Sequence, residues 1–294
     1  MPELPDLSVY LTALKSRVGG EILDAIRLSS PFILRSVTPS IEELVNHRVI
    51  AVNRIGKQIV FELEDHLYIV IHLMIAGRFR WYKSGAKIPA RIGLIAFDFS
   101  SGTLILTEAG QKHRASVHLV SGIDELDAFN RGGLEIFRIS TLEFKDALGI
   151  ENHTLKRSLT DQRFIAGIGN AYSDEILHHA RLSPMKQSRF LKDDEWRRLY
   201  DSCQFVLSKW ARLLAEKSGD SFPTKVTAFH DEMAVHGKFK QPCPDCGNPV
   251  QRIRYASNEC NYCAQCQNQG NLLADRALSR LLKKDWPKKL EDLD

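Results

Sequence analysis

The chain has 294 residues, a formal net charge of +4 and a hydrophobic content of 44%. This length suggests two domains that each bury a core, and the composition is that of an ordinary water-soluble protein. No apolar run is long enough to span a membrane, and the amino terminus lacks the basic-then-apolar pattern of a secretory signal. We therefore expect a cytoplasmic monomer with no membrane partner. The positive charge suits a polyanionic partner but is also common in enzymes that bind none.

Apolar periodicity divides the chain into a β-rich first part and a helical second part. Residues 5–18 have helical spacing and end at Gly19-Gly20, which predicts a helix. From about 21 to 122 apolar and polar residues alternate, and a hairpin is expected over 92–99 and 103–107. Several short strands at this spacing indicate a sandwich or a barrel.

Helices are expected after residue 139. Ser140 and Glu143 form a possible capping box for a short helix that ends near Gly149. A longer helix over about 193–216 carries an apolar stripe, which we interpret as core packing.

Five of the six cysteines fall between Cys243 and Cys266. Two Cys-x-x-Cys pairs can complete a tetrahedral Zn²⁺ shell, and four protein ligands leave no open position for catalysis. The sequence thus predicts one structural Zn²⁺, although Cys260 leaves some choice of thiols. The expected ligands are Cys243, Cys246, Cys263 and Cys266.

Two amphipathic segments in 154–184 flank the glycine-rich turn Gly167-Ile168-Gly169. A helix that begins at such a turn presents backbone N–H groups, which suit a phosphate. Asn170, with Lys156 or Arg163 nearby, would assist, although a turn of this kind is more often just a turn.

The chain begins Met-Pro-Glu. Removal of Met1 would expose the secondary amine of Pro2, which could attack an electrophilic sugar carbon, with Glu3 as an acid or base. Many proteins begin this way without such a role.

In these features, and in their order, the chain resembles the formamidopyrimidine-DNA glycosylase/endonuclease VIII family. The resemblance covers nearly the whole chain and rests on Pro2-Glu3-Leu4-Pro5, Gly56-Lys57, His72-Leu73, the turn before Asn170, and the four cysteines with the trailing Gln267.

The resemblance implies an α+β fold, in which an N-terminal β-sandwich flanked by helices precedes a helix–two-turns–helix domain with a zinc-finger β-ribbon. We expect a catalytic sandwich at 1–125, a linker at 126–139, a DNA-binding helical domain at 140–235, a finger at 236–270 and a tail at 271–294.

The resemblance also implies a bifunctional DNA glycosylase/AP lyase of base excision repair, associated with the nucleoid, whose partner is DNA with damaged bases or abasic sites. Pro2 would form the Schiff base, Glu3 would assist proton transfer and Lys57 would contact phosphate near the lesion. The expected DNA contacts are Lys57, His72, Met74, Ile75, Lys156, Arg163, Asn170, Arg252, Arg254 and Asn258.

Several positions depart from the family pattern. Asn258 stands near the place of the usual finger arginine, Ile75 replaces an intercalating methionine beside Met74, and Asp6 replaces a glutamate. The loop 108–114 has no aromatic wedge, and the segment 218–229 is short for a lesion-capping loop. These changes favour oxidised pyrimidines, hydantoins or abasic sites over 8-oxoguanine.

Two other functions stay open. The chain could be a weakly catalytic or non-catalytic protein that binds damaged DNA on the same fold, as the missing wedge and finger arginine would allow. An RNA- or ribosome-binding zinc protein would require the amino-terminal match to be accidental.

Overall fold

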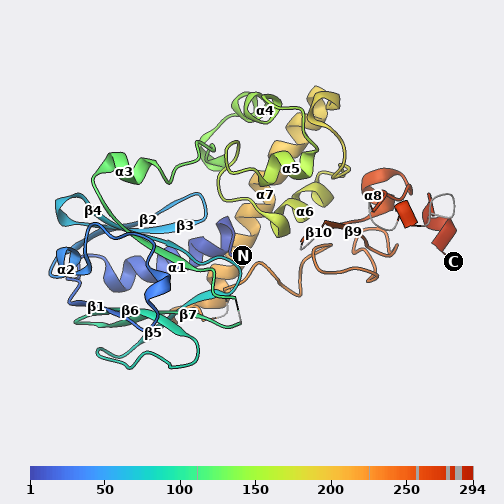
Figure 1. Cartoon of the computed structure of the whole chain (residues 1–294). Coiled ribbons are helices and arrows are strands. Elements are labelled where there is room, and N and C mark those ends of the chain that lie inside the picture. Colours follow the sequence, from blue (N-terminus) through green and yellow to red (C-terminus); the bar gives the residue numbers. More distant parts are fainter. Residues whose placement is uncertain (111, 225, 256–257, 276–278, 282–286, 294) are drawn as a thin grey trace. The chain divides into compact units, whose positions relative to one another are not determined.

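A computed structural model gives the fold (Figure 1) and describes every residue except 111, 225, 256–257, 276–278, 282–286 and 294. The chain forms two compact units, one of residues 1–131 with 210–227 and the other of residues 132–209 with 228–294. No helix in the described part of the chain is long and apolar enough to cross a membrane.

The first unit is a sandwich of two four-stranded antiparallel sheets (Figure 1), which confirms the expected sandwich. One sheet has the order β1-β6-β7-β5, with β1 at Ala25–Leu28, β6 at Gly93–Phe99, β7 at Gly102–Glu108 and β5 at Gly77–Tyr82. The other has the order β2-β3-β4-β8, with β2 at Val49–Ile55, β3 at Gln58–Leu63, β4 at Leu67–His72 and β8 at Ser116–Ser121. The hairpin expected over 92–99 and 103–107 is the β6–β7 pair.

Helix α1, Leu4–Val18, confirms the first predicted helix. Leu7, Tyr10, Leu14 and Val18 lie in one apolar core together with residues of both sheets. This packing holds the amino end of the helix in place. The short helices α2, Ile41–Leu44, and α3, Ile123–Asp127, complete the unit.

The second unit is mainly helical. It contains α4 at Thr141–Gly149, α5 at Leu155–Thr160, α6 at Asn170–His179, the hairpin of β9 at Gln251–Tyr255 and β10 at Asn258–Tyr262, and α8 at Ala264–Asn268. The capping box of α4 is confirmed, since the Glu143 N–H donates to Ser140 Oγ at 3.3 Å and the Ser140 N–H to Glu143 Oε2 at 2.8 Å.

The long predicted helix is α7, Asp193–Ser218, and it belongs to both units. Its first part buries Trp196, Leu199 and Cys203 in the second unit, whereas residues 210–227 belong with the sheets. Because residues 210–227 belong to the same unit as residues 1–131, the units are not consecutive segments of the chain. The detailed domain boundaries remain predictions.

A hydrogen bond inside the first unit should contribute measurably to its stability. The Phe79 N–H donates to the buried Tyr10 hydroxyl at 3.2 Å. Tyr10→Phe leaves this donor without its acceptor, so we expect the free energy of unfolding to fall by about 1–3 kcal/mol in urea denaturation. Tyr82→Phe is the matched control because Tyr82 is 40% exposed. Equal stability of the two variants would contradict the assignment.

Candidate functional site

A reciprocal pair of hydrogen bonds holds the amino terminus at the start of α1. The Glu3 N–H donates to Asp6 Oδ2 at 2.8 Å, and the Glu3 carboxylate accepts from the Asp6 N–H. Both side chains are buried, at 3% and 0% exposed. Aspartate at position 6 is therefore long enough to complete a capping box, which satisfies donors that a helix start leaves unpaired and fixes the first residues.

The terminal amine lies among charged groups. Burial lowers the pKa of the Met1 amine below 8.0; Glu3 and Asp6 act to raise it, while Arg78 and Lys57 act to lower it. A lower pKa increases the fraction of neutral amine near pH 7, and only a neutral amine has a free electron pair. This end of the chain thus favours the reactive form of an amine.

Lys57 is held close to this amine by a tight turn. Gly56 and Lys57 connect β2 to β3, and Gly56 has a φ of 57°, which glycine adopts readily. Lys57 is only 8% exposed, although it lies at a hairpin turn. The charge of the Lys57 ammonium contributes to lowering the pKa of the terminal amine.

His72, the last residue of β4, is neutral in this environment. The Met74 N–H donates to its Nδ1 at 3.1 Å, which places the ring proton on Nε2. Burial, and next the charge of Lys57, lowers the pKa of His72 to about 4. The imidazole can therefore donate one hydrogen bond from Nε2 at neutral pH.

The turn after His72 presents Ile75 outward. The Gly77 N–H closes the turn on Leu73 O at 2.9 Å, and a Cβ at Gly77 would lie 2.3 Å from that oxygen. Met74 adopts a left-handed φ of 52°, and Ile75 is 58% exposed. An apolar side chain is therefore exposed at the tip of a closed turn.

The loop after β7 is basic. Buried Glu108 accepts hydrogen bonds from the backbone N–H groups of Arg114 at 2.9 Å and Ala115 at 3.0 Å, which anchors the loop. The exposed side chains of its described part include Lys112, His113 and Arg114.

In the second unit, α5 and α6 are joined by a buried ion pair. Lys156 Nζ lies 2.6 Å from Asp174 Oδ1, with side-chain exposures of 10% and 0%, and it also donates to Asn170 O at 2.5 Å. Lys156 is thus matched by a carboxylate of the chain itself.

Two acidic residues of α6 that the sequence analysis overlooked attach the finger to the helices. Asp174 Oδ2 accepts from His236 Nδ1 at 2.8 Å and from the Asn261 N–H at 3.0 Å. Glu175 accepts the three successive backbone N–H groups of residues 234–236 at 2.8–2.9 Å. The sequence does show two adjacent acidic residues within a mostly apolar stretch of the helix, a pattern that predicts buried partners for them.

Asn170 also contacts the finger. Its Nδ2 donates to the backbone oxygen of Glu259 in β10 at 2.8 Å. Arg163, by contrast, is paired on the surface, 2.7 Å from Asp161 and 2.9 Å from Glu151. The structure brings Asn170 and Lys156 together but engages Arg163 with carboxylates.

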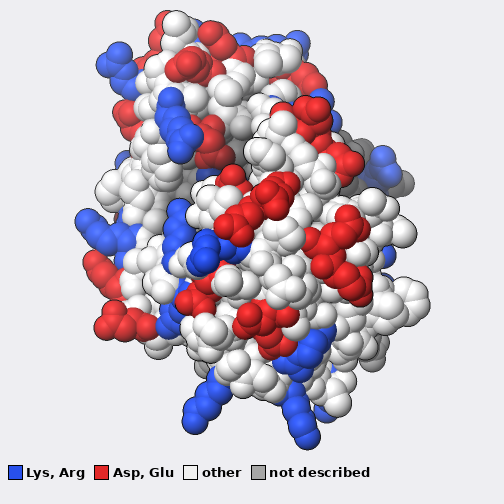
Figure 2. All heavy atoms as spheres, turned by 90° about the vertical axis from the view of Figure 1, so that its left-hand side faces the viewer, with Lys and Arg blue, Asp and Glu red and all other residues white. Residues whose placement is uncertain are grey.

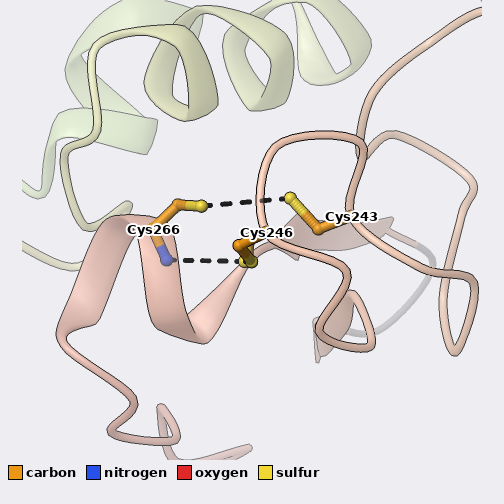
Figure 3. A group of neighbouring side chains, drawn as sticks. Cys243, Cys246 and Cys266 are labelled. Atoms are coloured by element: carbon orange, nitrogen blue, oxygen red, sulfur yellow. Dashed lines mark hydrogen bonds between the residues drawn. The ribbon is translucent and has the colours of Figure 1, made fainter.

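The four predicted zinc cysteines form one cluster, and their Sγ atoms all lie within 4.8 Å of one another. Cys243 and Cys266 Sγ are 3.9 Å apart and face each other (Figure 3), and Cys246 and Cys263 Sγ are 3.4 Å apart. Tetrahedral Zn–S bonds of about 2.3 Å require sulfur separations of about 3.8 Å. The cluster therefore fits a zinc ion.

The thiols of this cluster differ in how readily they ionise. Burial, and after it hydrogen bonds with neighbouring thiols, raises the pKa of Cys263 to about 12. At Cys246 burial acts to raise the pKa, but hydrogen bonds with Asn248, Cys263 and Cys266 together lower it to about 7. Cys260 is fully buried and lies outside the cluster of four cysteines.

The finger arginines lie on β9. The Arg252 guanidinium packs over the Phe239 ring at 4.1 Å and lies 3.7 Å from Glu259, whereas Arg254 is exposed. Asn258 begins β10 opposite Tyr255, and its side chain lies outside the described residues.

Basic and acidic side chains are interspersed on the face of the molecule drawn in Figure 2. The net charge of +4 is therefore not gathered into one basic area on that face.

A sandwich with a partly buried terminal amine, followed by a helix–two-turns–helix unit with a four-cysteine finger, defines a class of DNA glycosylases. Residues 1–114 match the model of the formamidopyrimidine-DNA glycosylase N-terminal domain, and residues 136–220 match that of the formamidopyrimidine-DNA glycosylase H2TH domain. The chain belongs to the formamidopyrimidine-DNA glycosylase family, and it is a DNA N-glycosylase and AP lyase that acts on oxidised bases in base excision repair.

Individual relatives support this assignment over nearly their whole length. A formamidopyrimidine-DNA glycosylase of Rickettsia massiliae is 28% identical over 275 residues, which are 91% of this chain and 97% of that protein. The Listeria monocytogenes enzyme is 26% identical over 278 residues, or 91% and 100% of the two chains.

Solved structures agree. Lactococcus lactis Fpg in complex with abasic-site DNA has a TM-score of 0.79 at 25% identity and covers 90% of this chain and 99% of its own. MutM in complex with DNA containing carbocyclic 8-oxo-G has a TM-score of 0.80 at 26% identity and covers 91% and 100%. Wild-type Lactococcus lactis Fpg bound to oxidised-pyrimidine DNA has the same TM-score, identity and two coverages.

His72 provides a test of the electrostatics around the amino terminus. We expect its imidazole to titrate near pH 4 in an NMR titration, far below the ordinary 6.5. Because the folded-state pKa is depressed, the associated stability is present above the unfolded pKa and decreases as pH falls from about 6.5 toward 4. His72→Asn identifies the resonance, and a midpoint near 6.5 would contradict the buried neutral ring.

Proposed function

We propose that the Pro2 amine, freed by removal of Met1, is the nucleophile that this glycosylase uses on damaged DNA. The observation that carries the proposal is the buried amino terminus, fixed by the Glu3–Asp6 capping box and close to Lys57. Removal of one residue would leave the new amine beside the same three side chains.

The chemistry begins with attack of the neutral amine on C1′ of the flipped-out nucleotide. The C1′–base bond breaks and the base leaves with its electron pair. The Glu3 carboxylate takes the proton from the attacking nitrogen and passes it to the ring oxygen as the C1′–O bond breaks, which gives an iminium between Pro2 and C1′. Loss of a C2′ proton then expels the 3′ phosphate by β-elimination, and a second elimination can release the 5′ phosphate.

DNA contacts in this proposal come from both units. Lys57 and His72 would bind phosphate near the lesion, and Met74 or Ile75 would occupy the gap left by the flipped base. Asn170, Arg252, Arg254 and Asn258 would contact the backbone from the second unit. In this proposal Lys156 and Arg163 support DNA binding only indirectly. Asp174 already neutralises Lys156, and Asp161 and Glu151 already neutralise Arg163.

Oxidised pyrimidines, hydantoins and abasic sites are the proposed substrates, in preference to 8-oxoguanine. The 108–114 loop supports this choice because it carries Lys112, His113 and Arg114 and no aromatic side chain. Cationic side chains in this loop can bind a phosphate or an exposed base edge, but the loop lacks an aromatic ring that could stack on a base.

We also propose one structural Zn²⁺ held by Cys243, Cys246, Cys263 and Cys266. Their separations fit a tetrahedral ion, and His178 Nε2 lies 3.3 Å from Cys243 Sγ, where it can donate a hydrogen bond to a thiolate ligand. The ion would hold the finger and take no part in bond breaking.

The alternative is a weakly catalytic or non-catalytic protein that binds damaged DNA. The absence of an aromatic wedge and the asparagine at position 258 favour it. The intact Pro2, Glu3 and Lys57 favour the enzyme, since binding alone does not require an amine with an acid beside it.

Borohydride trapping separates these functions. The wild type is incubated with oligonucleotides that carry an abasic site, thymine glycol, dihydrouracil, a hydantoin or 8-oxoguanine, and reduction fixes the iminium as a covalent adduct. We expect adducts with the abasic and pyrimidine-type lesions, located on the amino-terminal peptide by mass spectrometry. Pro2→Gly should still bind DNA but lose at least about 100-fold in cleavage.

Unchanged cleavage by Pro2→Gly would rule out the proposed nucleophile. Binding of every oligonucleotide with no adduct, even on the abasic one, would support the non-catalytic alternative instead.

Metal content tests the finger. Cys246→Ser removes one of four ligands, so we expect zinc measured by atomic emission to fall well below one ion per chain, with a lower midpoint of thermal unfolding. Cys203→Ala is the control, because Cys203 is buried in α7 outside the cluster. A wild type that is metal-free and fully folded would refute a structural zinc.

A further inference from the structure

A cavity of about 540 Å³ lies beside Asn170 in the second unit. Its lining includes the cations Lys156 and Arg157, His153, and the amides of Asn152, Asn170 and Gln187. None of the described lining residues is an aspartate or a glutamate. A wall of amides and cations without carboxylates suits an anion.

The cationic groups in this wall differ in how far their charge is already matched. Lys156 Nζ lies 2.6 Å from buried Asp174, and His153 Nε2 lies 2.6 Å from Glu151. Arg157 is exposed, and within the described part of the chain its guanidinium has neither a hydrogen bond nor an ion pair. The neighbouring carboxylate Asp161 is hydrogen-bonded to Arg163, and the charge of Arg157 acts on it only as the smallest of the causes that lower its pKa.

The helix explains the contrast between two adjacent residues. Consecutive residues of α5 point about 100° apart. Both residues line the cavity, but Lys156 directs its Nζ to Asp174, whereas the exposed Arg157 points away from that carboxylate. A guanidinium presents a planar fork of donors that matches two phosphate oxygens.

We propose that Arg157 binds a backbone phosphate of DNA in this cavity and is the main unmatched cation of the α5–α6 region. This assignment rests on the proposed DNA-binding function. In this assignment Arg157, and not Lys156, is the cation that displaces counterions from DNA on binding. The charge of Lys156 instead stabilises the fold through Asp174.

The test is the salt dependence of affinity for a duplex that contains a tetrahydrofuran abasic analogue, measured by fluorescence anisotropy between 50 and 200 mM KCl. One lost phosphate contact lowers the slope of log K against log salt by about 0.9. We expect this change in Arg157→Ala and Arg157→Gln, with affinity about tenfold weaker at 50 mM. Arg157→Lys should restore the slope.

Arg212→Ala is the matched control, since the Arg212 side chain is 77% exposed on α7 and, among the residues that the structure describes, forms an ion pair only with Glu216, at 3.9 Å. It should keep the wild-type slope. Zinc content and the thermal midpoint confirm that each variant is folded.

Wild-type binding with an unchanged slope in both Arg157→Ala and Arg157→Gln would overturn this assignment and leave the proposed function standing. A wild type whose affinity does not depend on salt would overturn the phosphate interface as a whole.

Discussion

The second unit depends on one buried carboxylate. Asp174 is 1% exposed, and it binds Lys156 of α5, His236 and the Asn261 N–H of β10. Removal of one partner from a buried ion pair costs about 3–5 kcal/mol, because the remaining charge loses its compensation. With Glu175 beside it on α6, this carboxylate makes the helices and the finger a single body, so that Asn170 is placed by the finger as well as by its own turn.

That constraint decides which charges remain for a ligand. A lysine that neutralises a buried aspartate cannot lose this partner without destabilising the fold, so it is poorly suited to exchange it for a phosphate. The same logic applies more weakly to Arg163, whose pairs with Asp161 and Glu151 are surface contacts that contribute little each. Cationic residues near a proposed DNA surface therefore differ in function according to their partners within the chain.

The sequence was informative where structure depends on neighbours along the chain. Helix α1, the β6–β7 hairpin, the Ser140 capping box and α7 all follow from local periodicity or from side chains three residues apart. The cysteine cluster was also predictable, because its spacing already encodes the geometry of the ion. The partners of Lys156 were not, since Asp174 lies a further 18 residues along and meets it through the fold alone. The return of residues 210–227 to the first unit has the same origin.

At the amino terminus, burial and charge act in opposite directions. Glu3 and Asp6 raise the pKa of the amine, yet burial and the cations Arg78 and Lys57 prevail and lower it. Neutralising Glu3 would therefore make the amine still less basic and more often neutral, while removing the group proposed to transfer protons. If catalysis fell in a variant that kept the Glu3–Asp6 capping box, the fall would reflect proton transfer and not a smaller fraction of neutral amine. Neutralising Glu3 thus increases the neutral fraction of the amine but removes the proposed proton transfer. The two effects have opposite signs, so they can be separated experimentally.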